Sequence, residues 1–142
     1  MSDDTFEIKS ASGRSALEIS AWQTDDPARR FDYLDITLTA AGLRASARIY
    51  NIDHTGSPSD LPAFFEDMAR NWRGWPGEKH WVSIEHDVEL ACTSSTLGNV
   101  TMVVILDSYV DDPFIWDVRC SIVLESWQLE PLAGRAKKFF QI

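Results

Sequence analysis

Residues 33–50 read YLDITLTAAGLRASARIY, in which apolar and polar side chains alternate on either side of Gly42. Alternation with a period of two residues is typical of a β-strand that has one buried face. The two alternating halves are separated by only a couple of residues, so we expect them to pair as an antiparallel hairpin. This hairpin predicts that the fold is built on an antiparallel β-sheet.

The same alternation recurs outside this hairpin. Strand-like runs lie around residues 6–8 and 17–22, and again at 80–92, 99–106 and 115–125. In the run 80–92 we place in one apolar phase Val82, Ile84, Val88, Leu90 and Cys92. We expect about seven antiparallel strands in one sheet, the last three of which form a meander with one face on the core.

After a break at residues 54–59, the apolar period changes from two to about 3.6 residues, which predicts an amphipathic helix in mid-chain. Its apolar face holds Leu61, Phe64, Phe65, Met68, Ala69 and Trp72. A shorter C-terminal helix is expected to begin near Pro131, because proline suits the first turn of a helix. The predicted fold class is therefore α+β. We expect the mid-chain helix to cover one sheet face and the C-terminal helix to pack beside it or at the sheet end.

Length and composition are those of one globular domain spanning residues 1–142, with residues 1–4 expected to be disordered. The formal net charge is -9, and the acidic residues are spread evenly along the chain. Such a chain repels nucleic acid and anionic membranes, so we expect neither as a partner. Charge favours a basic protein as the partner. The alternative is that the acidity only keeps the protein soluble.

The two cysteines are expected to be reduced thiols. Cys92 and Cys120 fit no CxxC or zinc-ligand spacing, and both occupy the apolar phase of a strand. The first residues show no basic region followed by an apolar run, and no apolar stretch approaches the length of a membrane span. We therefore expect a cytoplasmic protein.

The sequence carries no motif that identifies a reaction. The patterns GxSxG, GxGxxG and HExxH and the phosphate-binding P-loop are all absent. His80 and His86 would lie about 20 Å apart along a regular strand, too far to share a metal ion. Asp53 beside His54 is the pair that suggests acid–base chemistry or a small-ligand site, but no nucleophile accompanies it. We expect no enzyme activity, no cofactor and no metal.

The polar phase of the strands is less polar than an ordinary solvated sheet face. It includes Trp22, Tyr33, Tyr50 and Trp81, interleaved with both signs of charge. Glu85, Asp87 and Glu89 alternate along one run and form an acidic row. A face of this composition suits a partner protein or a second copy of the chain. The alternative is that aromatic residues suit strands whichever way they point.

The densest aromatic cluster is the run WRGWPGEKHW at residues 72–81, between the mid-chain helix and the next strand. Trp72 and Trp75 can seal the helix onto the sheet. In the functional interpretation, the run provides a rigid aromatic anchor for a partner. We include Trp75 on that ground among the predicted partner-binding residues, with the aromatic and acidic residues of the polar phase.

One family resemblance rests on short motifs spread over residues 60–140. They are Trp72-x-Gly-Trp75, Lys79-x-Trp81, Gly98-x-Val100, Trp116 and a terminal Phe139-Phe140. Their order resembles a family of small uncharacterised bacterial proteins catalogued as a domain of unknown function. The resemblance implies a small, acidic, cytoplasmic protein without catalytic residues, like the immunity proteins of bacterial toxin systems. It brings no functional residues with it.

Three hypotheses follow from these patterns. The first is a non-enzymatic protein-binding domain, in particular an immunity-type inhibitor of a basic bacterial toxin. The second is a homo-oligomeric structural protein, a homodimer at least, that uses the same outward sheet face. The third is an enzyme or small-ligand binder with its site near Asp53 and His54.

Overall fold

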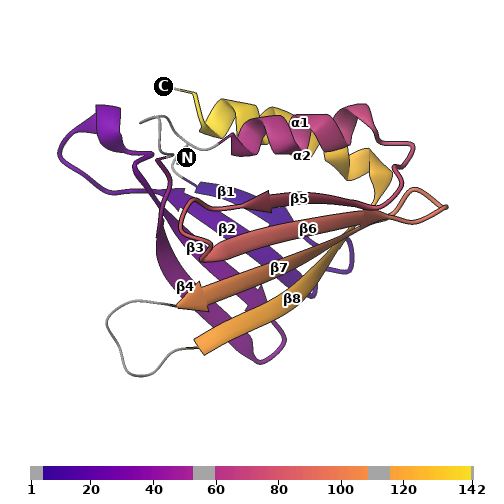
Figure 1. Cartoon of the computed structure of the whole chain (residues 1–142), viewed down its shortest axis with the longest axis horizontal. Helices are drawn as coiled ribbons and strands as arrows, with labels where there is room; N and C mark the ends of the chain where they lie inside the picture. The colour runs from indigo at the N-terminus through magenta and orange to yellow at the C-terminus, as the bar shows by residue number, and fades with distance from the viewer. Residues whose placement is uncertain (1–4, 53–59, 109–115, 142) are drawn as a thin grey trace.

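The computed structural model describes residues 5–52, 60–108 and 116–141, and it places two antiparallel sheets of four strands there (Figure 1). The first sheet contains β1 (Thr5–Lys9), β2 (Ser15–Ala21), β3 (Tyr33–Ala40) and β4 (Leu43–Tyr50). The second contains β5 (Glu78–Val82), β6 (Val88–Ser94), β7 (Val100–Ser108) and β8 (Trp116–Leu124). The helices are α1 (Leu61–Arg70), α2 (Ser126–Phe139) and a short 3-10 turn at Pro27–Arg29. Within these ranges, no helix has the length and hydropathy needed to cross a membrane.

Both sheets are meanders, because each strand pairs with the next strand in the chain. The hairpin predicted from residues 33–50 is confirmed, with Ala40 paired to Leu43 across the turn that contains Gly42. Gly42 has a φ of 73°, a conformation that glycine adopts without steric cost. The α+β class and the antiparallel pairing are confirmed as well. The disorder predicted for residues 1–4 concerns a segment outside the described residues.

The two sheets face each other, and the helices lie side by side across the edges formed by β1 and β5 (Figure 1). Buried side chains from both sheets and both helices form one core cluster. On the helical side of this core, Phe6 of β1 contacts Phe65 of α1 and Phe139 of α2, with ring centroids 5.7 and 6.0 Å apart. The mid-chain helix therefore closes the edges of two sheets, where the sequence predicted that it would cover one sheet face.

The prediction of one seven-stranded sheet is wrong in two respects: the strands divide into two sheets between β4 and β5, and the run 80–92 contains a chain reversal that adds an eighth strand. The Ser83 hydroxyl accepts the backbone amides of Asp87 (3.1 Å) and Val88 (3.0 Å). His86 lies within this turn with a φ of 61°. These bonds end β5 at Val82 and start β6 at Val88, and the two strands then pair with each other. The alternating pattern does not reveal this turn, because Ile84 is apolar at the position where a continuous strand would place an apolar residue.

The turn also reverses which side chains face the core. Trp81 lies opposite the buried Leu90 and packs against the core, so its predicted outward position is wrong. Val82 lies opposite Glu89 and shares the outer face of the second sheet. The apolar phase predicted for the run 80–92 is therefore right for β6 but wrong for Val82 and for Ile84, which is 41% exposed.

The two sheets are joined where the turn between β1 and β2 meets β8. The Ala11 amide donates to the Val123 carbonyl at 2.8 Å, and the Ser15 hydroxyl donates to the Ser121 carbonyl at 2.9 Å. The Ser10 hydroxyl accepts the Val123 amide at 3.2 Å. The outer edge of β4 differs, since no strand pairs with it in the described part of the chain.

The C-terminal helix begins earlier than Pro131. The side chain of Glu125 and that of Gln128 cap each other's backbone amides, and this capping box starts α2 at Ser126. Pro131 consequently lies inside the helix, although proline there removes one amide donor. Sequence reasoning missed this start because the usual signal is a serine or threonine at the cap, and here the cap is a glutamate.

The contact of Phe65 with Phe6 provides a test of how the helices hold the fold. We expect Phe65→Ala to lower the free energy of unfolding by about 3 to 5 kcal/mol, because it opens a cavity in the core. Urea denaturation measures this change. The control is Phe64→Ala at the half-buried neighbouring position, which should cost less. Equal losses for the two variants would contradict the placement of α1.

Candidate functional site

An aromatic row crosses the outer face of the first sheet. Trp22 lies edge-on to Tyr33, with ring centroids 5.0 Å apart, and Tyr33 lies edge-on to Tyr50 at 5.3 Å. Tyr33 and Tyr50 are paired residues of β3 and β4, while Trp22 directly follows β2. Edge-to-face contacts of this kind each contribute about 0.5 to 1.5 kcal/mol, so each ring stabilises its neighbour. Three of the predicted partner-binding residues therefore lie together.

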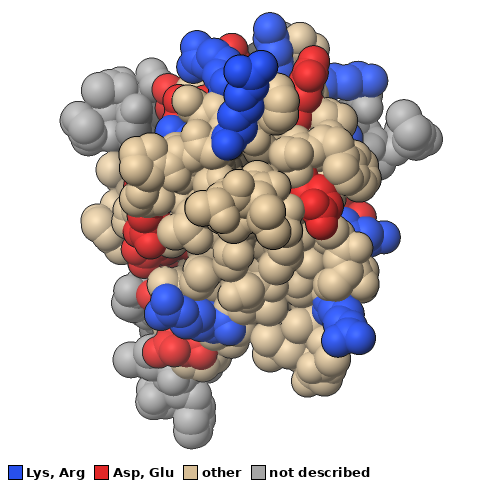
Figure 2. Space-filling view, turned by 90° about the vertical axis from the view of Figure 1, so that its right-hand side faces the viewer, with Lys and Arg blue, Asp and Glu red and all other residues tan. Residues whose placement is uncertain are grey.

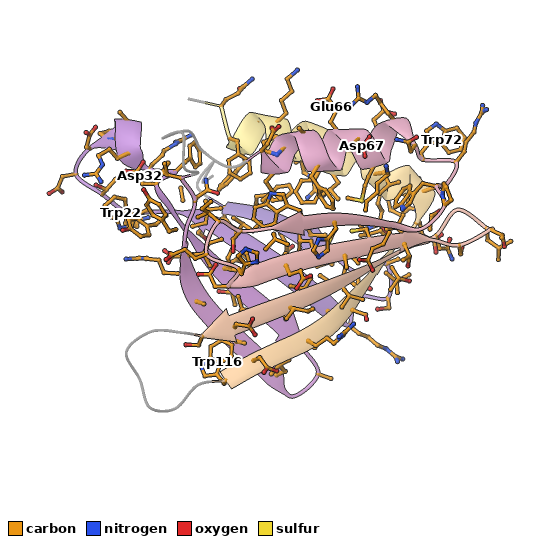
Figure 3. All side chains as sticks on the ribbon, in the orientation of Figure 1. Trp22, Asp32, Glu66, Asp67, Trp72 and Trp116 are labelled. Atoms are coloured by element: carbon orange, nitrogen blue, oxygen red, sulfur yellow. The ribbon has the colours of Figure 1, made fainter. Side chains whose placement is uncertain are left out.

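Two arginines beside this row are already paired with carboxylates. Arg48 makes two hydrogen bonds to Asp35, at 2.8 and 3.1 Å, and these bonds raise the pKa of the guanidinium. Arg29 donates to Asp32 at 2.8 Å, which raises its pKa, and its guanidinium lies 5.5 Å from the Trp22 ring centroid. Figure 3 shows Trp22 and Asp32 together at the end of the molecule away from Trp72. Each arginine charge is thus offset by a neighbouring carboxylate.

A groove of about 710 Å³ runs beside β4 and connects the aromatic row with the second sheet. One wall is formed by Tyr33, Ser46, Ala47, Arg48 and Tyr50, and the other by Glu85, Asp87, Asp107 and Ser108. Three carboxylates therefore face a wall whose arginine is paired with Asp35. The groove is negatively charged, and its first wall carries tyrosine rings.

The backbone of β4 adds hydrogen-bonding groups to this groove. Ala40 and Leu43 close the two-residue hairpin turn, so in the usual ladder the odd-numbered residues of β4 bond to β3. The Asn51 amide, the next odd-numbered one after β4, follows the same pattern and donates to the Asp32 carbonyl at 2.8 Å. The backbone groups of Ser46 and Arg48 therefore point toward the groove. An edge of this kind can pair with an extended segment of another protein.

The acidic row predicted from Glu85, Asp87 and Glu89 is divided by the turn between β5 and β6. Glu85 and Asp87 lie in that turn and reach the groove, and Asp87 also accepts a 2.5 Å hydrogen bond from Ser83. Glu89 lies on the outer face of β6, where it contacts His80. The prediction of a regular acidic row along one strand is therefore wrong. Glu85 and Asp87 nevertheless line the same groove as Tyr33 and Tyr50.

Trp75 and Trp81 lie away from the groove and pack against the core. Trp75 donates its ring N–H to the Cys92 carbonyl at 3.1 Å, and the Lys79 ammonium lies 5.2 Å from its ring centroid. Lys79 also pairs with Asp67 of α1 at 2.7 Å. Trp75 thus sits where β5 meets α1, as the structural interpretation of this tryptophan expects. A role for Trp75, Trp81 or Glu89 in partner binding stays a prediction.

In the described residues, the chemically reactive residue types are dispersed. Asp53 and His54, the predicted acid–base pair, lie outside the described residues. No group of three histidine, cysteine or acidic side chains with metal-binding geometry occurs in the part that the structure describes. Cys92 is fully buried, and this burial, with the nearby charge of Glu78, raises the pKa of its thiol to about 12. Cys120 is a second free thiol and is half-buried.

Residues 8–142 match the model of a family of unknown function (DUF6228). This match confirms the resemblance found in the sequence and extends it from residues 60–140 to nearly the whole chain, including the first sheet. Neither the curated proteins nor the solved structures contain a match to this chain. No activity is assigned to this family, so any functional argument for the chain depends on the geometry of the groove.

The two thiols should differ in reactivity. Because Cys92 is buried and its pKa is raised, native protein treated with iodoacetamide should be alkylated at Cys120 only, and urea should expose both sites. In the unfolded chain the thiol ionises near its ordinary pKa of 9.0, so Cys92 destabilises the fold as pH rises above that value. Peptide mass mapping checks the labelling, and Cys92→Ala should flatten the alkaline fall in stability. Alkylation of native Cys92 would contradict both expectations.

Proposed function

Because the chain belongs to the DUF6228 family, whose function is unknown, we propose from the groove beside β4 that it is a non-enzymatic protein-binding domain for a basic partner. The observation that carries this proposal is the placement of Tyr33 and Tyr50 opposite three carboxylates across one groove. Tyrosine faces attract cationic side chains, and carboxylates pair with them. A partner segment rich in arginine or lysine can contact the tyrosine rings of one wall and pair with the carboxylates of the other.

The edge of β4 supports an extended conformation for that segment. A strand added beside β4 would bond to the backbone of Ser46 and Arg48, and its side chains would alternate between the two walls. One phase would lie beside Tyr50, and the other would face Glu85 and Asp107. The backbone bonds supply affinity that depends little on sequence, whereas the alternating cations supply specificity.

An immunity-type inhibitor of a basic bacterial toxin is the specific form of this function that we propose. The net charge of -9 supports it, because opposite charges accelerate the encounter of two proteins and suppress wrong partners. Inhibition by such a domain requires only that it occupy a cationic surface. The family resemblance suggested the same role, in part from the same acidity of the chain.

Partner capture from an extract of the native cells tests the proposal. The wild-type chain should retain a basic protein at low and at moderate salt. Glu85→Lys should lower the affinity for that protein about tenfold or more, because it reverses one charge on the acidic wall. Glu66→Lys makes the same change on α1, which contributes no lining residue to the groove, and should leave the affinity unchanged. Recovery of no protein partner by the wild-type chain would count directly against the proposed function.

A proline substitution separates strand pairing from charge attraction. Ser46→Pro removes an amide that points away from β3, so the edge strand should still fold but should lose one bond to an added strand. We expect calorimetry to show weaker binding of the captured partner to Ser46→Pro than to the control Ser46→Ala. The control removes only the side-chain contact with Thr37 (3.0 Å). Equal binding by the two variants would exclude pairing along β4 and leave the acidic wall as the docking element.

A further inference from the structure

A second surface lies at the opposite end of the molecule from Trp22, where the end of α1, the turn between β6 and β7, and the start of α2 converge (Figure 3). A Cβ atom added to Gly74 would lie 3.1 Å from the Ser94 hydroxyl oxygen, and one added to Gly98 would lie 3.8 Å from the Ser126 Cβ. Three large apolar side chains are exposed here: Trp72 by 50%, Leu97 by 86% and Trp127 by 72%. Figure 2 views the molecule from this end and shows a broad central area without charged residues.

A hollow of about 760 Å³ lies between the two helices on this surface. Its lining includes Ala69, Trp72, Trp127, Pro131 and Gly134. Two tryptophans thus line the hollow together with three smaller residues, and Ser126 and Glu130 complete the lining. Such a combination of exposed aromatic side chains and a hollow is typical of a protein–protein contact.

Gly134 is the residue that the fold itself does not explain. Glycine is among the weakest helix formers, yet Gly134 lies inside α2. Its φ is not positive, and an added Cβ would meet no atom within 4 Å among the described residues. Pro131, one turn earlier on the same helix, is a second residue that weakens a helix. Both line the hollow, so the missing or short side chains leave room there for a close approach from outside the chain.

We propose that this surface binds a second copy of the chain, with Trp127 of each copy inserted into the hollow of the other. A two-fold interface must be self-complementary, and here a protruding side chain and a hollow lie next to each other on one face. Charge supports the same occupant. Two chains of charge -9 repel each other least when they meet through faces with little charge, and the central area of this end carries none in Figure 2.

One residue of each charge lies in or next to the hollow, as a two-fold pairing needs. Glu130 of α2 lines the hollow, and the Arg73 guanidinium lies 5.1 Å from the ring centroid of Trp72, which also lines the hollow. A two-fold rotation can place Arg73 of one copy beside Glu130 of the other, twice per interface. A partner with strong charge of either sign would face one unfavourable rim residue. This inference is independent of the proposed groove beside β4.

Analytical ultracentrifugation of the full chain tests the proposal. At high micromolar concentration the wild type should sediment with twice the 16.1 kDa mass of one chain. Trp127→Ala should raise the dissociation constant of the dimer about tenfold or more, because it removes the inserted ring. Trp22→Ala removes a tryptophan from the other end and should leave the dimer unchanged. A wild-type monomer at every concentration, or a dimer that Trp127→Ala does not weaken, would overturn the proposal.

Further variants keep the test independent of folding. Gly134→Gln places a better helix former in the hollow, so it should raise the melting temperature of the monomer while weakening the dimer. Its control, Lys138→Gln at an exposed position of α2, should leave the dimer intact. Arg73→Glu and Glu130→Arg should each weaken the dimer, and the double variant should restore it. A failure of the double variant to restore dimerisation would remove the two-fold arrangement proposed here.

Discussion

The buried hydroxyl of Ser83 is the constraint on which the second half of the structure depends. It is 3% exposed, accepts two backbone amides and donates to Asp87. These bonds reverse the chain between β5 and β6, so that Trp81 turns toward the core while Glu85 and Asp87 come to the end of the groove. Without the reversal, residues 80–92 would form one strand in which Val82 and Ile84, instead of Trp81, share the buried face with Leu90. One short polar side chain therefore determines both the core packing of this sheet and the charge of the groove.

The other polar side chains that the fold buries serve similar purposes. Ser10 and Ser15 bond to the backbone of β8, and the Asn51 amide group donates to the Phe31 carbonyl at 2.9 Å. In the described ranges, no buried side-chain nitrogen or oxygen lacks a hydrogen-bond partner. Each of these side chains stabilises a place where the chain turns or where the two sheets meet. Polar groups in a low-dielectric interior are costly unless paired, and here the pairing also joins the strands.

The sequence predicts local features of this fold much better than features that depend on long-range contacts. The hairpin of β3 and β4 is readable because both strands alternate regularly around Gly42. The same alternation correctly gives Trp22, Tyr33 and Tyr50 one outer face. It does not reveal the turn at Ser83, because Ile84 keeps the apolar phase while its backbone leaves the sheet. The groove was not predictable either, since Tyr50 and Asp107 belong to different sheets, and no periodic pattern reports the spacing between two sheets.

The bonds between the first and last parts of the chain determine when this domain can finish folding during synthesis. Each meander is local in sequence, so the pairings within it can form early. The Arg135 guanidinium, however, donates to the Glu7 carbonyl 128 positions away, and Phe139 packs on Phe6. On a ribosome, the first sheet is therefore complete in sequence while its apolar face still lacks a cover. The N-terminal half must wait for the second sheet and the last helix to emerge, and during this interval its apolar face is exposed to aggregation or to capture by a chaperone.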